Sequence, residues 1–172
     1  MGETTSRQQQ KKKKNFRADV EATPHLKYQW KSGLGALRPE DKLHIVLEDT
    51  STSHLKGSVD IDSSLRSLFP NSNRWDFAIG YKHVNLNDEV IYWVEFHTGT
   101  DNQIKVVLAK LDWLKSWLNT DGVRLTDYKR KFIWAPSGRT SFTKGSVQVK
   151  QLASRGITYT GANFKIALNF SK

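Results

Sequence analysis

The clearest hydrophobic pattern in the chain predicts a long amphipathic helix that begins at Thr100 and ends before Gly122. Apolar residues recur there three or four positions apart, which places them on one helix face. They are Ile104, Val107, Leu108, Leu111, Leu114, Trp117 and Leu118. Thr100 and Gln103 have the spacing of a capping box. We expect the stripe to be core, with Trp113 and Trp117 packing there rather than stacking on nucleic-acid bases.

Two apolar, aromatic-rich runs before this helix predict a pair of antiparallel strands. The runs are RWDFAIGYK at 74–82 and VIYWVEFHT at 90–98, and the segment between them contains Asn85, Asn87 and Asp88. Such polar residues are typical of a hairpin loop. The two runs are therefore expected to pair side by side in a sheet.

Further elements complete an alternating pattern. Strands are expected in KLHIVLED at 42–49, in KFIWAPS at 131–137 and within 157–170. Helices are expected from Val59 to just before Pro70 and over 146–155. From Val59 onwards the order is helix, strand, strand, helix, strand, helix, strand. This mixture predicts a single α/β domain with a central mixed sheet flanked by helices.

Length and charge divide the chain into a tail and one domain. The chain has 172 residues, enough for a single domain with a substantial core. Residues 1–20 are polar and carry six basic and two acidic side chains, so we expect a disordered basic tail there and the α/β domain over 21–172. The opening MGETTS also matches an N-myristoylation pattern through Gly2 and Ser6.

Composition limits the chemistry and suggests a partner. The chain has no Cys, which excludes thiol nucleophiles, disulfides and Cys-type zinc sites. No apolar run approaches the ~20 residues that span a bilayer, so we expect a cytoplasmic protein without a transmembrane segment. The net charge of +10 favours a polyanionic partner, most often nucleic acid. Basic residues that can hold its backbone are Lys105, Arg139, Lys144 and Lys150, the alternative being an exposed basic surface.

Acidic residues interrupt the two central runs. Asp76 and Glu95 stand in segments that otherwise read as buried strands, and carboxylates are rarely buried unless they pair or bind a cation. Glu95 and His97 share a strand face because side chains alternate. We expect the three side chains to converge, with the carboxylates repelling one another in the absence of metal. The alternative is a buried carboxylate held by hydrogen bonds and a histidine at a sheet end.

The order of these elements resembles the PD-(D/E)XK nuclease superfamily. The resemblance covers roughly Val59 to Pro136. An acid, Asp76, stands at the start of one strand, and a Glu-x-basic pattern, Glu95 and His97, stands near the end of the next; an amphipathic helix and a strand follow. It places Asp76 and Glu95 at the family's two metal-binding acids. His97 stands where the family usually has lysine, and an imidazole can accept a proton from water or bind the metal instead. Lys82, Lys105 and Lys110 are alternative sources of the missing ammonium group.

The resemblance implies a restriction-endonuclease-like fold and a function. It implies an endonuclease dependent on Mg²⁺ or Mn²⁺ that hydrolyses phosphodiester bonds in DNA or RNA, and it is compatible with a homodimer. Asp76 and Glu95 would hold the metal and His97 would orient or activate water. Two other hypotheses stay open: a non-catalytic nucleic-acid-binding protein on the same fold, and a protein-interaction module.

Overall fold

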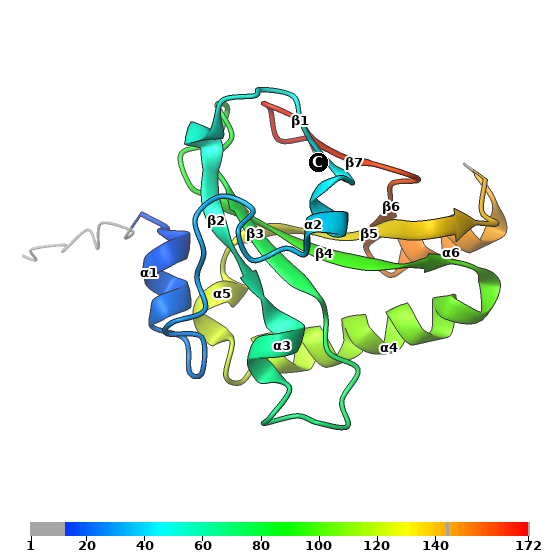
Figure 1. The fold of residues 1–172 in the computed structure, drawn as a ribbon, viewed down its shortest axis with the longest axis horizontal. Coiled ribbons are helices and arrows are strands. Elements are labelled where there is room, and N and C mark those ends of the chain that lie inside the picture. Colours follow the sequence, from blue (N-terminus) through cyan, green and yellow to red (C-terminus); the bar gives the residue numbers. More distant parts are fainter. Residues whose placement is uncertain (1–12, 144, 172) are drawn as a thin grey trace, which may run out of the picture.

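A five-stranded mixed sheet forms the centre of the protein (Figure 1). The computed structural model describes residues 13–143 and 145–171. The strands are β2 (Leu55–Asp60), β3 (Phe77–Tyr81), β4 (Val90–Gly99), β5 (Lys129–Thr140) and β6 (Ile157–Tyr159), which lie in that order. The first three are antiparallel, whereas β4, β5 and β6 run parallel. The predicted single α/β fold with a central mixed sheet is therefore confirmed.

Helices connect the parallel strands, as a parallel pair requires a crossover. The crossover from β4 to β5 contains α4 (Asp101–Leu118) and α5 (Val123–Thr126), and the one from β5 to β6 contains α6 (Val147–Ser154). Shorter elements precede the hairpin of β3 and β4: α1 (Phe16–Glu21), α2 (Pro39–Lys42), a 3₁₀ turn (Thr52–His54) and α3 (Ile61–Leu65). In the described ranges no helix is long and apolar enough to cross a membrane.

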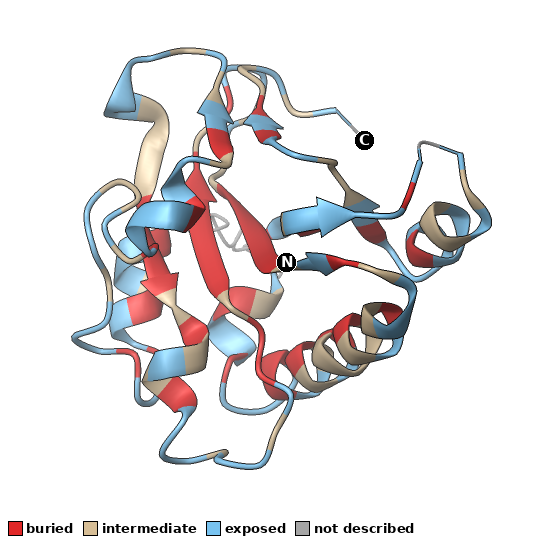
Figure 2. Ribbon diagram, turned by 45° about the vertical axis from the view of Figure 1, so that its right-hand side comes forward, coloured by how far each residue is buried: buried red, intermediate tan, exposed pale blue. Residues whose placement is uncertain are grey.

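The sheet has a hydrophobic core on each face. On one face, Ala78 and Trp93 pack with Val107 and Leu111 of α4. On the other face, strand residues such as Val94 pack beneath a two-stranded parallel sheet. This small sheet consists of β1 (Ile45–Leu47) and β7 (Phe164–Ile166). Buried residues accordingly concentrate along the central strands and on the inward side of the long helix (Figure 2).

The N-terminal boundary of the domain differs from the expected one. The expected tail extended to residue 20, whereas α1 begins at Phe16 with Asn15 as its N-cap. Phe16 and Val20 are fully buried, and the Phe16 ring lies so close to Gly80 that a Cβ there would clash with it at 2.4 Å. The domain therefore includes this helix. The first part of the expected tail, with the myristoylation pattern, lies outside the described residues.

The start of α4 also differs from the expected one. Thr100 is the N-cap residue, but within the described part of the chain its side chain makes no capping hydrogen bond. Gln103, the expected partner in a capping box, instead contacts His97. The apolar stripe is core as expected, because Ile104, Val107, Leu111, Leu114, Trp117 and Leu118 are buried. Trp113 stacks on Trp117 with 6.2 Å between ring centroids, in keeping with a packing role.

Candidate functional site

Asp76 and Glu95 lie opposite each other where the pairing of β3 and β4 ends. The last paired residues are Phe77 and Val94. Beyond them each carboxylate accepts a backbone N–H from the other strand. Glu95 Oε2 accepts from Asp76 N at 3.1 Å, and Asp76 Oδ2 accepts from Phe96 N at 3.0 Å. The carboxylates thus replace the missing ladder hydrogen bonds and hold each other in place.

Lys110 on α4 lies between the two carboxylates. Its Nζ is 3.2 Å from Asp76 Oδ1 and also donates to Glu95 Oε1. The Glu95 side chain is completely buried, and those of Asp76 and Lys110 are only 13% and 14% exposed. The two carboxylates lie close together and repel one another as expected, but the Lys110 ammonium group, which was not expected between them, neutralises part of their charge.

Burial dominates the electrostatics of this cluster. Loss of water raises the pKa of Glu95 well above its usual value, and the neighbouring charge of Asp76 raises it further, against the opposing effect of Lys110. Burial by itself would lower the pKa of Lys110, but the two carboxylates reverse that effect and raise it. Lys110 therefore stays protonated at neutral pH, while Glu95 holds a proton more readily than an ordinary glutamate.

His97 adjoins Glu95 and is oriented from its far side. Its Nδ1 lies 3.6 Å from Glu95 Oε1, and its Nε2 lies 2.6 Å from Gln103 Oε1. An amide oxygen only accepts hydrogen bonds, so the proton of the neutral imidazole belongs on Nε2. That tautomer leaves the lone pair of Nδ1 facing the carboxylate cluster.

The structure adds Arg38 and Asp41 to the site. Arg38 precedes α2, and its Nη2 lies 3.8 Å from Asp76 Oδ2. Its Nε donates to Asp41 Oδ2 at 2.5 Å, and its guanidinium lies over the Phe77 ring at 5.6 Å from the centroid. The Asp41 residue is only 2% exposed. No sequence pattern indicated these residues, because nearly forty positions separate them from Asp76 along the chain.

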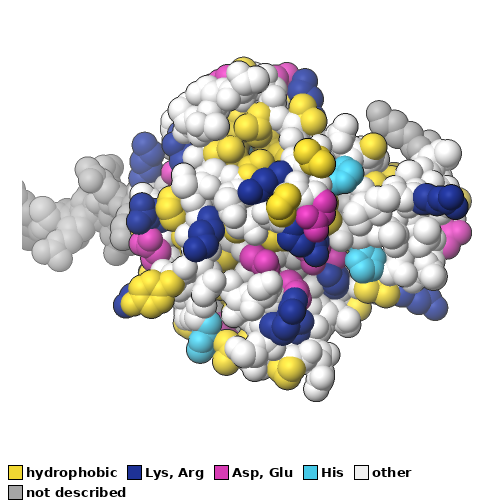
Figure 3. All heavy atoms as spheres, in the orientation of Figure 1, with side chains coloured by type: hydrophobic (Ala, Val, Ile, Leu, Met, Phe, Trp, Pro, Cys, Tyr) yellow, Lys and Arg dark blue, Asp and Glu magenta, His cyan; other side chains and the backbone are white. Residues whose placement is uncertain are grey.

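A pocket of about 190 Å³ opens beside Asp76. Its lining consists of Arg38, Asp60, Asp62, Ser63, Arg66, Asp76 and Phe77. Asp60 and Asp62 thus lie at the same pocket as Asp76, but Asp60 caps α3 through the Ser63 N–H and Asp62 pairs with Arg66. Figure 3 shows acidic and basic side chains together in the middle of this face of the molecule.

The donor set of the cluster matches a hard cation that keeps part of its water. Mg²⁺ is commonly bound through one or two carboxylates, with the other positions left to water and phosphate oxygens. Asp76 Oδ1 and Glu95 Oε1 already share one positively charged group, the Lys110 ammonium. Among the residues that the structure describes, no group of three or more His, Asp or Glu side chains is placed to hold a metal. Asp76 and Glu95 are the carboxylates that could hold a cation at this cluster.

The expected nucleic-acid contacts are spread over several elements. Lys105 lies on α4, Arg139 near the end of β5 and Lys150 on α6, all with exposed side chains. Within the described ranges no ion pair joins them to Asp76 or Glu95. Lys144 lies outside the described residues. Their contact with nucleic acid stays a prediction.

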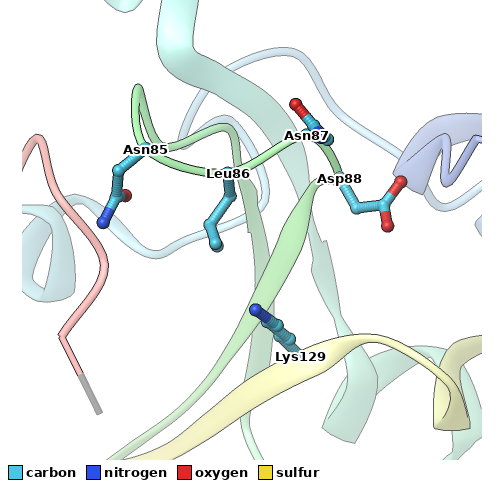
Figure 4. A pocket seen from close by; sticks show the side chains of 5 residues that line it. All are labelled: Asn85, Leu86, Asn87, Asp88 and Lys129. Carbon is cyan, nitrogen blue, oxygen red and sulfur yellow. The ribbon is translucent and has the colours of Figure 1, made fainter.

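A second pocket lies far from the carboxylates along the same hairpin. It is lined by Asn85, Leu86, Asn87, Asp88 and Lys129 (Figure 4). Four of these residues belong to the loop between β3 and β4, at the opposite end of these strands from Asp76 and Glu95. It brings together none of the candidate catalytic residues.

Comparison of the chain with protein-family models, curated proteins and solved structures finds no match.

Proposed function

We propose that the protein is a metal-dependent nuclease that hydrolyses phosphodiester bonds in DNA or RNA. The observation that carries the proposal is the buried pair of Asp76 and Glu95, which share the Lys110 ammonium group. Asp76 is also part of the lining of an open pocket. Its neighbour Glu95 is a buried acid whose pKa is raised, a typical feature of functional sites. The net charge of +10 favours a polyanionic substrate.

The residues of the cluster have separate roles in this proposal. Asp76 and Glu95 bind the metal, with the backbone N–H groups of the opposite strands fixing their carboxylates. When bound, a divalent cation supplies charge stabilisation at phosphate oxygens and lowers the pKa of a water ligand. His97 takes the proton of the attacking water at Nδ1 and is held for this by Gln103. Lys110, protonated at neutral pH, orients the attacking water.

One observation favours a second function, a non-catalytic nucleic-acid-binding protein. Lys110 contacts both carboxylates, so the cluster is already paired within the chain without metal. In that case the cluster stabilises the fold, and the basic surface alone binds nucleic acid. The two functions differ in one respect that can be measured directly, which is cleavage.

The test is a cleavage assay with end-labelled single- and double-stranded DNA and RNA, in Mg²⁺, in Mn²⁺ and in EDTA. We expect cleavage by the wild type with either metal and none in EDTA. Asp76→Asn and Glu95→Gln should each reduce the rate by about 100-fold or more, because each removes a charged metal ligand and the loss of an outer-shell partner already costs about 10–100-fold. Asp112→Asn is the matched control, since Asp112 is an exposed acid on α4 paired with Arg155. Metal-independent binding without cleavage in any condition would favour the second function.

A further inference from the structure

A buried aspartate fixes an arginine at the pocket beside the carboxylate pair. The Asp41 residue is 2% exposed, and burial raises the pKa of its carboxyl group. In the described ranges its side chain has one hydrogen-bond partner, Arg38 Nε at 2.5 Å. Burying a carboxylate costs free energy that a single half-exposed partner offsets only in part. The arrangement stabilises one orientation of Arg38 rather than the fold.

Arg38 retains free donors in this orientation. Its side chain is 53% exposed, and across the described part of the chain no hydrogen bond engages either Nη atom. Nη2 lies 3.8 Å from Asp76 Oδ2, beyond hydrogen-bond distance. The guanidinium plane is further restrained over the Phe77 ring. A preorganised guanidinium with unused Nη donors at a pocket is suited to bind phosphate oxygens in a bidentate manner.

Neighbouring charges explain why Arg38 is the residue that suits a phosphate. The other arginine in the lining of the pocket, Arg66, donates from Nη2 to Asp62. Lys110 is engaged by Asp76 and Glu95. Arg38 is thus the pocket cation that lies next to a candidate metal ligand and whose hydrogen bond uses Nε.

We propose that Arg38 binds the substrate phosphate next to the carboxylate pair, and that Asp41 is its positioning residue. This inference rests on the proposed function for the identity of the substrate, a phosphodiester of nucleic acid. It places the phosphate in the pocket of about 190 Å³ between α2, α3 and the start of β3. A neutral backbone analogue such as a methylphosphonate would lose this contact.

The first test is binding of a fluorescently labelled oligonucleotide in EDTA over a range of salt concentrations. Arg38→Gln should weaken binding about tenfold or more and reduce the slope of log K against log salt by about one, as loss of one phosphate contact does. Arg17→Gln is the matched control, because Arg17 also pairs through Nε with an acid, at 2.9 Å, and lies over an aromatic ring. Binding by Arg38→Gln equal to that of the control would overturn the inference.

The second test concerns Asp41 and uses cleavage in Mg²⁺. Arg38→Gln should lower kcat/KM about 10- to 100-fold, and Asp41→Asn should lower it less, since the guanidinium remains but is no longer fixed. The double variant should equal Arg38→Gln alone, because Asp41 acts only through Arg38. Additive losses would show that Asp41 has a separate, structural role. If the wild type does not cleave, the proposed function fails, and the binding test in EDTA still decides the role of Arg38.

Discussion

Replacing Lys110 by Met should destabilise the protein, and the loss should depend on pH. Met is similar in length to the aliphatic part of Lys, so the substitution keeps the apolar contacts of this side chain on α4. It removes the ammonium group that contacts Asp76 and Glu95. Because Glu95 is completely buried, its charge would be left without compensation. Removing one partner of a buried ion pair costs about 3–5 kcal/mol of unfolding free energy. We expect a loss of that size at pH 8.

The loss should become smaller in acid. The pKa of Glu95 in the folded protein lies above its value of 4.5 in the unfolded chain, so the folded state binds the proton more tightly. The contribution of Glu95 to the unfolding free energy is therefore fully present below about pH 4.5, and it is lost as the pH rises through the pKa of the folded state. Without Lys110 the folded pKa rises further. Glu95 in the variant therefore takes up a proton at a higher pH than in the wild type, and as the pH is lowered the loss should shrink towards about 1–2 kcal/mol, that of broken hydrogen bonds.

Urea unfolding followed by circular dichroism at pH 5, 6.5 and 8 measures this dependence. Lys110 itself stays charged throughout, because its folded pKa lies above 10.5. Lys105→Met is the control, since Lys105 is an exposed lysine on the same helix, and its replacement should change the unfolding free energy by no more than about 0.5 kcal/mol. The reasoning is refuted if Lys110→Met matches this control at pH 8, or if its loss is the same at all three pH values.

Two further predictions follow from contacts of single residues. His97→Lys should retain or raise cleavage and remove the dependence of rate on imidazole titration, and a pH–rate profile identical to that of the wild type would exclude a role for His97 in proton transfer. Phe16→Ala should lower the unfolding free energy by about 3–5 kcal/mol, since Phe16 is fully buried against Gly80. Tyr28→Ala, at a side chain 78% exposed, should have little effect in the same chemical or thermal melts.

Local sequence determined the long elements and the pairing of the carboxylates. The apolar stripe of α4 repeats with the period of a helix over five turns, so no tertiary information is needed to recognise it. The hairpin of β3 and β4 is equally local, because a polar loop joins two apolar runs that are neighbours in the sequence. Asp76 and Glu95 were expected to converge in this pair of strands, and they lie opposite each other just beyond the last paired residues.

Tertiary structure decided which other groups reach the carboxylates. Lys110 was one of three candidate lysines, and only the packing of α4 against the sheet selects it. Gln103 has the spacing of a capping residue, yet a contact with His97 satisfies its side chain instead. Phe16 stands beside a run of lysines that predicts a solvated tail, and its burial depends on the absence of a Cβ at Gly80, far along the chain.

Arg38 and Asp41 show most clearly that contacts between distant segments cannot be predicted from local sequence. Their own segment has no feature that distinguishes them from other charged pairs on a short helix. Their position beside Asp76 arises from a chain path that brings α2 over the start of β3, and no local propensity encodes such a path. Periodicity and turn residues act over a few positions, so they determine elements and neighbouring pairs. Contacts between distant segments arise only when the apolar faces of those elements are buried together.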